Sequence, residues 1–318
     1  MGQFINPFTD VGFKRIFGQE VSKPVLLAFL NSLLEGERTI VDLKFLDKEM
    51  LGISDGDRSL IYDIYCETAT GEHIIVEMQY KSQPYFKERS IYYTARSIVQ
   101  QGERGDEWQY DIKAVYLVAF LNFKLSSISQ DFRTDVALMD MVRHTIFSDK
   151  VRLVYLQLPY FTKEADDCET IFEKIIFTLK HMDILERMPW MAQNAVFQRL
   201  SEIADVASLN KEERIKYDAN MKAFRDTIAV MEGQYMEGHE EGLAKGLAKG
   251  LAKGRAEGRE EGRAEGLEEG LAKGRTKGLE EGLAKGIQSV AKTMKNAGKS
   301  IEEIVAMTGL DRSVIEAL

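Results

Sequence analysis

The pattern of hydrophobic and polar positions over residues 1–237 predicts helices interleaved with strands. Helical spacing of apolar side chains marks residues 10–17, 24–34 and 86–101. Short runs rich in β-branched and aromatic residues predict strands at residues 40–45, 59–67, 73–79, 114–121 and 151–158. Residues 167–187 and 189–237 have helical patterns, the second with Pro189 at a helix start. This order predicts an α/β sandwich built on a mixed sheet.

The sequence changes character at Gly238, where a four-residue repeat begins. Glycine occupies every fourth position up to Gly286, and helix-forming residues fill the positions between. On a helix with about 100° per residue, a period of four turns the glycine stripe by about 40° per repeat, so the stripe winds around the helix. Two interpretations remain: a long exposed helix that self-associates through blocks of like charge, or a solvated spacer that is helical only in part.

Residues 287–318 have two short amphipathic patterns joined at Gly309, which resemble a helix-turn-helix. They carry four basic and four acidic side chains, so they lack the positive surface that DNA affinity requires. We therefore expect a small packing or oligomerisation module there. The predicted organisation is a core at 1–160, a helical extension at 161–237, the glycine repeat at 238–286 and the C-terminal module at 287–318.

The charge of the chain limits how it can contact nucleic acid. The net charge of the 318 residues is -9, and the repeat is neutral with ten basic and ten acidic residues, so the excess negative charge lies in residues 1–237. Any DNA contact must then come from a local patch or a bound cation. The longest apolar run, residues 114–121, is too short to span a membrane, and no apolar leader follows Met1. We expect no membrane contact and a cytoplasmic location.

The most informative stretch is the predicted hairpin at residues 61–79. If Gly71 supplies the left-handed position of a three-residue loop, the strand register places Asp63 opposite Glu77, with Gln79 beside Glu77. Side-chain alternation then puts one set of residues on a core face: Tyr62, Ile64, Cys66, Ile74, Val76 and Met78. The opposite face, with both carboxylates, is expected to face solvent.

Two carboxylates that meet on a sheet repel each other by roughly 3 kcal/mol at about 5 Å and an effective dielectric constant of about 20. The repulsion raises one pKa or demands a cation. Mg²⁺ suits such a pair, because it takes one or two carboxylates and leaves coordination positions for a phosphate. A phosphodiester is then the natural substrate. The alternative is an ordinary sheet surface on which Arg58, Lys81 or Arg89 balances the charge.

A resemblance to a known family bears on this choice. Asp63, thirteen intervening residues and Glu77-Met78-Gln79 resemble the D…(D/E)xK pattern of the PD-(D/E)XK nucleases. The opening PFTDVGFKRIFG, the segment KERSIYYTARSIVQQ and the glycine-repeat tail are similar to the Rpn-like PD-(D/E)XK family transposases, also called recombination-promoting nucleases. The resemblance implies a restriction-endonuclease-like α/β core with a mixed sheet flanked by helices. It also implies a Mg²⁺-dependent endonuclease that hydrolyses DNA in recombination or transposition.

The same resemblance implies roles for particular residues. Asp63 and Glu77 would be the metal carboxylates, with the Met78 carbonyl as a further ligand. Gln79 stands where the pattern has Lys, and its amide can donate a hydrogen bond or orient the attacking water. The alternative function is a catalytically silent DNA-binding or self-assembling scaffold protein with a nuclease-like fold.

Three further residues are candidates for the same site. Asp10 and Lys14 share a helix face, where Lys14 could hold a phosphate and Asp10 could approach the metal; they could equally form an exposed ion pair. Arg89 is a candidate phosphate contact. Four tyrosines are candidates for stacking on bases or for packing: Tyr62, Tyr65, Tyr92 and Tyr93.

Overall fold

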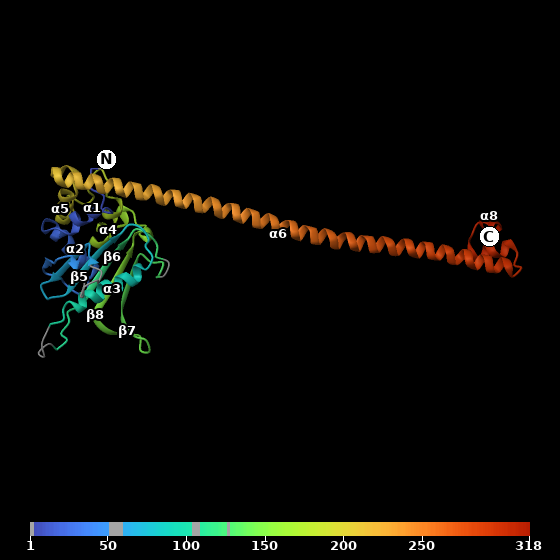
Figure 1. Ribbon diagram of the computed structural model, residues 1–318, viewed down its shortest axis with the longest axis horizontal. Helices are drawn as coiled ribbons and strands as arrows, with labels where there is room; N and C mark the ends of the chain where they lie inside the picture. Colours follow the sequence, from blue (N-terminus) through green and yellow to red (C-terminus); the bar gives the residue numbers. More distant parts are fainter. Residues whose placement is uncertain (1–2, 51–59, 104–108, 126–127) are drawn as a thin grey trace, which may run out of the picture. The chain divides into compact units, whose positions relative to one another are not determined.

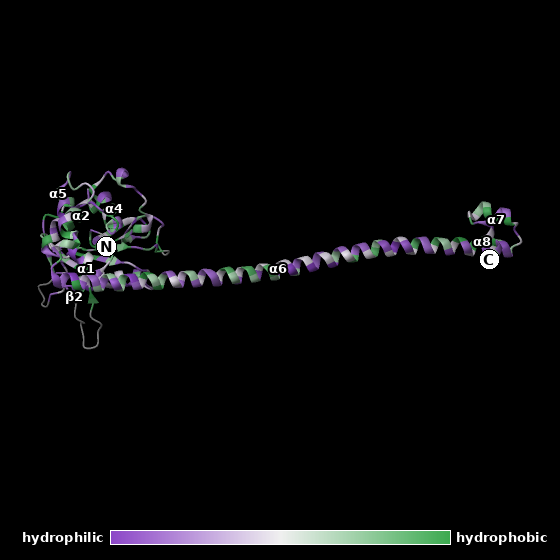
Figure 2. Cartoon of the chain, turned by 90° about the horizontal axis from the view of Figure 1, so that it is seen from above, coloured by the Kyte–Doolittle hydropathy of each residue, from purple (hydrophilic) through white to green (hydrophobic). Residues whose placement is uncertain are grey.

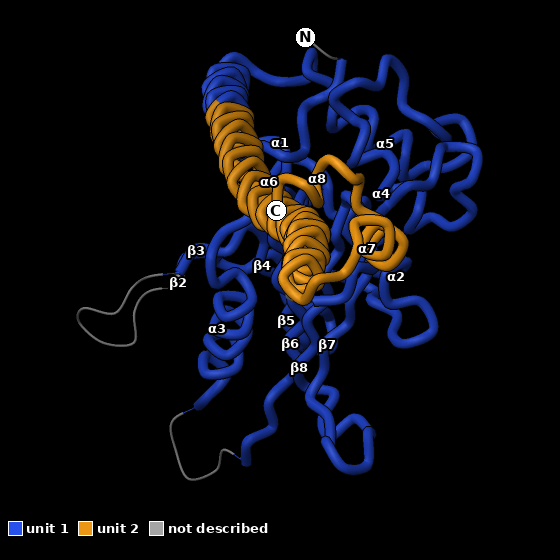
Figure 3. The backbone as a smooth tube through the Cα atoms, turned by 90° about the vertical axis from the view of Figure 1, so that its right-hand side faces the viewer, with its two compact units in different colours: residues 1–229 blue, residues 230–318 orange. Residues whose placement is uncertain are grey.

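The computed structural model (Figure 1) describes residues 3–50, 60–103, 109–125 and 128–318. It divides into two compact units, Met1–Ala229 and Val230–Leu318, which are coloured separately in Figure 3. The boundary between them falls inside one long helix, α6 (Lys211–Asn296).

A mixed sheet of six strands forms the centre of the first unit, with the order β1-β4-β5-β6-β8-β7. The strands are β1 (Leu43–Phe45), β4 (Ile64–Thr68), β5 (His73–Gln79), β6 (Val115–Leu121), β7 (Arg133–Asp140) and β8 (Thr145–Gln157). β5, β6 and β8 run parallel, whereas β1, β4 and β7 join by antiparallel pairing. Two short strands, β2 (Glu49–Met50) and β3 (Leu60–Ile61), pair separately.

Helices cover both faces of this sheet. The main hydrophobic core packs one face against α1 (Asp10–Phe17), α2 (Lys23–Leu33), α4 (Ile171–His181) and α5 (Ala195–Ala204). A second cluster packs the other face against α3 (Phe86–Val99). All seven residues of β6 are buried, because this parallel strand is covered on both sides. The predicted α/β fold with a mixed sheet and flanking helices is confirmed.

The hairpin that joins β4 to β5 has the predicted register. Cys66 pairs with Ile74 and Ile64 with Val76, and Gly71 has the positive φ of 89° that its loop position requires. Two expectations about its faces were wrong. Tyr62 packs in the α3-side cluster, because the strand is interrupted between β3 and β4 and the alternation does not continue across the break. Glu77, on the face with the carboxylates, is also not open to solvent, because α3 packs over that face, whereas Asp63 is half-buried.

Other differences concern element boundaries. The hairpin of β7 and β8 was predicted only in part, since β7 was missed and β8 begins at Thr145 rather than at residue 151. Pro189 does not start a helix: α5 begins at Ala195, and the Asn194 side chain caps it by accepting a hydrogen bond from the N–H of Val196. The predicted helices 10–17, 24–34 and 86–101 match α1, α2 and α3 within two residues. Ser59, where one strand was expected to begin, and Arg58 lie outside the described residues.

The glycine repeat lies within α6, a continuous helix of 86 residues. Figure 2 shows hydrophobic and hydrophilic residues alternating along it. Leu243, Leu247 and Leu251 are each more than half exposed, and over the whole repeat the four-residue period carries the leucine stripe around the helix. An added Cβ at Gly250 or Gly254 would find no heavy atom within 4 Å apart from its chain neighbours and the helix's own backbone.

The second unit ends in a small helical cluster. α7 (Ile301–Thr308) and α8 (Arg312–Ala317) pack with the end of α6 around Ala291, Ile304 and Ile315. Gly309 ends α7 in the left-handed conformation, with φ at 70°. Among the described residues, no helix has the length and hydrophobicity that a membrane span requires.

Candidate functional site

The candidate site lies where the chain enters β4 beside the end of β5. Ile64 pairs with Val76, so the preceding residue, Asp63, lies next to Glu77 on the neighbouring strand. The interruption between β3 and β4 leaves the backbone of Asp63 outside the regular ladder. The side chain of Asp63 pairs with the neighbouring strand instead. One of its carboxylate oxygens accepts a hydrogen bond from the Met78 N–H at 2.8 Å.

Glu77 is held by the same part of the hairpin. Its Oε1 accepts a hydrogen bond from the Asp63 N–H at 3.2 Å, and its Oε2 accepts one from the Gln79 amide at 3.4 Å. Glu77 is only 3% exposed. Asp63, Glu77 and Gln79 therefore form one hydrogen-bonded group, in which each carboxylate is oriented by the backbone of the opposite strand.

The environment of these carboxylates disfavours their charged forms. Burial raises the pKa of Asp63 above its ordinary value, and the hydrogen bond from Met78 and the charge of Lys14 offset only part of this effect. Burial also raises the pKa of Glu77, and the negative charge of Asp63 raises it further. When both carboxylates are ionised, the site therefore holds more negative charge than its surroundings stabilise.

Helix α1 brings two of the predicted residues to this group. Thr9 caps the helix by accepting a hydrogen bond from the Gly12 N–H, which fixes its first turn near the hairpin. Asp10 and Lys14 form an ion pair across one helical turn. Lys14 also lowers the pKa of both Asp63 and Glu77. The expected ion pair is therefore present, and its lysine lies close enough to act on the carboxylates of Asp63 and Glu77.

Arg89 approaches from α3, on the other side of the sheet. Its guanidinium lies over the rings of Phe86 and Tyr93, at 5.0 and 5.7 Å from their centroids, and donates a hydrogen bond to Gln83. Its Nε is buried and has no hydrogen-bond partner among the described residues. The charge of Arg89 also lowers the pKa of Asp63 and Glu77. All six predicted side chains thus belong to one neighbourhood.

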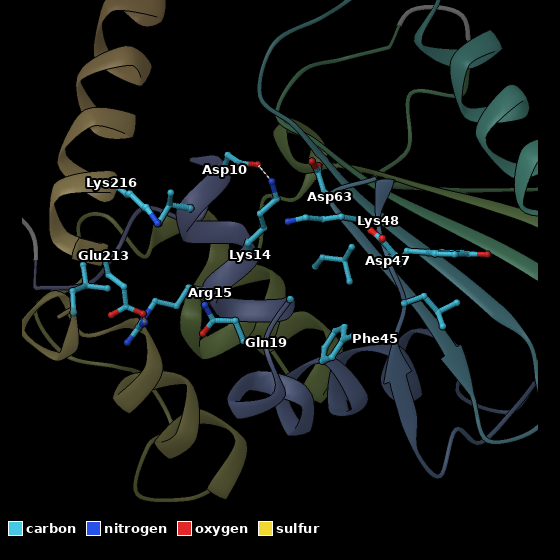
Figure 4. Close-up of a pocket in the computed structure, with 16 residues that line it drawn as sticks. Asp10, Lys14, Arg15, Gln19, Phe45, Asp47, Lys48, Asp63, Glu213 and Lys216 are labelled. Atoms are coloured by element: carbon cyan, nitrogen blue, oxygen red, sulfur yellow. Dashed lines mark hydrogen bonds and ion pairs between the residues drawn. The ribbon is translucent and has the colours of Figure 1, made fainter. Parts of the chain in front are cut away.

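Asp63 opens onto a cavity of about 590 Å³. Figure 4 shows Asp10 and Lys14 on one wall and Lys48 extending into the cavity from another. The first turns of α6 form a third wall with Glu213 and Lys216. The cavity therefore contains both acidic and basic side chains, and it connects Asp63 to solvent.

Several cavity residues were not predicted from the sequence. Lys48 follows β1 in a segment without a motif, and Glu213 lies 150 residues beyond Asp63 along the chain. Arg15 holds Glu213 in place, because its guanidinium pairs with that carboxylate at 2.7 Å and so attaches α1 to α6. The only sequence signal for this contact was the charge of Arg15 in the helix predicted at residues 10–17.

The tyrosines named as stacking candidates do not share one role. Tyr62 and Tyr65 are buried, and the Tyr65 hydroxyl forms hydrogen bonds with His73 and Ser97 at 2.7 and 3.0 Å. Tyr93 lies beneath Arg89, while Tyr92 is about half exposed on α3. Tyr62, Tyr65 and Tyr93 therefore pack within the protein.

Comparison with known proteins places the chain in a family. No curated protein and no solved structure matches it. The sequence profile of the PD-(D/E)XK nuclease family transposases matches residues 7–234, which is more than two thirds of the 318-residue chain. The matched segment includes α1, the hairpin with Asp63 and Glu77, and α3. The chain therefore belongs to the PD-(D/E)XK nuclease family transposases.

Proposed function

We propose that the protein is a Mg²⁺-dependent DNA endonuclease in which Asp63, Glu77 and Gln79 form the catalytic group. Membership of a nuclease and transposase family supports this class of function. One observation carries the proposal further: the buried carboxylate of Glu77 lies beside the half-buried carboxylate of Asp63, and the pKa of each is raised. Such a pair is stabilised by a cation that binds both.

The donor set fits a hard divalent ion. Among the described residues, no group of three or more His, Cys, Asp or Glu side chains is arranged to hold a metal. Mg²⁺ needs no such group, since it binds through one or two carboxylates and keeps several waters. Asp63 and Glu77 would hold it, with the Met78 carbonyl as a third protein ligand. A bound divalent ion supplies Lewis-acid polarisation of a phosphoryl oxygen and neutralises developing negative charge.

The other side chains of the site have roles that follow from their contacts. Lys14 extends toward the carboxylates from α1 and would donate a hydrogen bond to an oxygen of the scissile phosphate. Gln79 uses its amide N–H₂ on Glu77, so its carbonyl oxygen can accept a hydrogen bond from the attacking water and orient it. The positive charge of the Arg89 guanidinium would lie near both carboxylates and reduce the repulsion between them.

The test is nicking of supercoiled plasmid by the full chain in Mg²⁺. Asp63→Asn and Glu77→Gln remove one charge each and keep the side-chain size, so we expect nicking to fall at least 100-fold in both. Glu67→Gln is the matched control, since Glu67 lies on β4 two residues beyond Tyr65 and pairs with His73. It should cut like the unmodified protein.

Two outcomes would reject the proposal. Nicking that survives both charge-removing substitutions would place the activity elsewhere. Absence of nicking by the unmodified protein, with DNA binding retained, would favour the silent DNA-binding scaffold.

A further inference from the structure

A second cavity, of about 350 Å³, lies beside the candidate catalytic group. Its walls come from the segment before α1, from the end of β5 and the loop after it, and from α6. Asp10 lines both cavities, and Gln79 of the proposed catalytic group lines this one. The two cavities therefore flank the same acidic residue, Asp10. We call the second cavity the Tyr80 pocket, with these lining residues: Phe8, Thr9, Asp10, Met78, Gln79, Tyr80, Lys81, Gln83, Asn220, Ala223, Phe224 and Thr227.

Aromatic rings from three parts of the chain gather in the Tyr80 pocket. The rings of Tyr80 and Phe224 lie with centroids 4.4 Å apart and planes at 57°, and Phe8 lies 6.1 Å from Tyr80. Phe8 also packs against the main core. Neither Tyr80 nor Phe224 belongs to a hydrophobic cluster within the described part of the chain. Both residues are half-buried. Part of their aromatic surface is therefore exposed at the edge of the protein.

Three neutral amides, those of Gln79, Gln83 and Asn220, are among the polar groups of the Tyr80 pocket. The amide N–H₂ of Gln79 donates to Glu77, that of Asn220 donates to the Lys216 carbonyl at 3.1 Å, and the Gln83 carbonyl accepts from Arg89. The opposite ends of the three amides supply two acceptors and one donor. Asp10 is the single carboxylate in the lining, and it is paired with Lys14.

This chemistry differs from that of the first cavity. There, Asp47, Asp63 and Glu213 join Asp10 among charged lysine and arginine side chains, a lining suited to a cation and a phosphate. In the Tyr80 pocket, aromatic faces lie next to amide edges, with the exposed Lys81 at one side. A nucleobase presents the matching features, namely a flat π-surface and a rim of hydrogen-bond donors and acceptors.

We propose that the Tyr80 pocket binds an unpaired nucleobase of the DNA strand whose phosphate lies at Asp63 and Glu77. This inference rests on the proposed endonuclease function and specifies its substrate. A paired base is stacked in the duplex with its edge occupied, so it reaches such a pocket only from a single strand or after extrusion from the helix. The preferred substrate is therefore single-stranded DNA, or duplex DNA at a site where a base is unpaired.

Binding of two oligonucleotides to the full chain tests this directly. One is a fluorescein-labelled single strand of twelve thymidines, and the other is a twelve-residue strand of abasic sites with the same phosphates. Because every position of the second strand lacks a base, that strand cannot place a base in the pocket by binding in a shifted register. Fluorescence anisotropy in Ca²⁺, a hard cation with the same preference for oxygen ligands, gives the affinity ratio of the two strands. We expect the thymidine strand to bind about 5- to 140-fold more tightly, which is the contribution of stacking on one aromatic site.

Variants of α6 assign that ratio to the pocket. Phe224→Ala should bring the ratio near one, whereas Phe224→Tyr keeps an aromatic face and should keep the ratio. Ala223→Leu, at an exposed helix position that lines the pocket, fills part of it without removing a ring and should also lower the ratio. Ile215→Ala is the control, since Ile215 is exposed on the same helix and lines neither cavity.

The results separate this inference from the proposed function. A ratio near one in the unmodified protein would overturn the base pocket, as would a ratio that Phe224→Ala and Ala223→Leu leave unchanged. Plasmid nicking that persists in either case would leave the endonuclease proposal standing. If the unmodified protein neither nicks plasmid nor binds any of the strands, both the base pocket and the endonuclease proposal are rejected.

Discussion

Replacing Glu77 by Gln removes the buried carboxylate that lies beside Asp63 and keeps the shape of the side chain. The introduced amide oxygen can still accept the hydrogen bond from the Asp63 N–H, which Glu77 accepts at 3.2 Å. The Gln79 amide can rotate to accept from the new N–H₂ group. The substitution therefore changes the electrostatic energy of the site far more than its packing, and the metal-free protein should become more stable while it loses activity.

The magnitude follows from the contact between the two residues. Carboxylates about 5 Å apart repel by roughly 3 kcal/mol at an effective dielectric constant of about 20. Lys14 and Arg89 oppose this repulsion, so we expect Glu77→Gln to raise the free energy of unfolding by about 1–3 kcal/mol at pH 8 without metal.

The effect should depend on pH in a defined direction. The ordinary pKa of a glutamate is 4.5, and that of Glu77 in the folded protein is raised well above it. Between these two values the folded state binds more protons than the unfolded state, so stability falls as the pH rises. The raised pKa of Asp63 acts in the same direction. The unmodified protein should therefore lose stability from about pH 5 to pH 8, and Glu77→Gln should lose less.

Urea unfolding in EDTA at pH 5, 6, 7 and 8 measures this difference. Tryptophan fluorescence is a suitable probe, because Trp190 packs against the core of the first unit. Glu67→Gln, on the same hairpin, should stay within about 0.5 kcal/mol of the unmodified protein. If Glu77→Gln is less stable than the unmodified protein at pH 8, or if both have the same pH profile, the carboxylate pair is not strained and the reasoning fails.

Three further predictions address other parts of the chain. Lys14→Met should lower the cleavage rate roughly 10- to 150-fold by removing a charge-assisted hydrogen bond, whereas Lys44→Met on β1 should not; single-turnover kinetics would show whether the two variants differ. Gly250→Ala and Gly254→Ala should each stabilise α6 by about 1 kcal/mol, since an added Cβ meets no atom within 4 Å apart from its chain neighbours and the helix's own backbone; an unchanged melting curve by far-UV circular dichroism would contradict this. If the tail mediates self-association, removal of residues 238–318 should convert an oligomer into a monomer in sedimentation equilibrium, and an unchanged mass would argue against that role.

The local parts of the site could be predicted because a few neighbouring residues determine them. Gly71 sets the loop, the loop sets the register, and the register brings Asp63 next to Glu77. The same logic failed at Tyr62, since side-chain alternation holds only while the strand is continuous. It also failed for the solvent exposure of Glu77, because its burial depends on α3, whose packing over the hairpin no local pattern specifies.

The distant parts of the site could not be predicted in the same way. Lys216 and Phe224 reach the two cavities because α1 is attached to α6 by Arg15 and Glu213 and because the Tyr217 hydroxyl accepts a hydrogen bond from the Asn6 N–H at 2.8 Å. These contacts join residues more than 190 positions apart. A single sequence has no short-range signal for such a pairing. The glycine repeat was expected to be either a self-associating helix or a spacer that is helical only in part; the structure describes a continuous helix there, and self-association stays a prediction.

Binding of Mn²⁺, a paramagnetic substitute for Mg²⁺, tests the central claim most directly. Titration of the full chain, followed by the electron paramagnetic resonance signal of unbound Mn²⁺, should reveal a cation site that Asp63→Asn and Glu77→Gln each abolish or weaken at least tenfold. Glu67→Gln should bind Mn²⁺ as the unmodified protein does. Equal binding by all four proteins would contradict the claim that Asp63 and Glu77 together form a cation site.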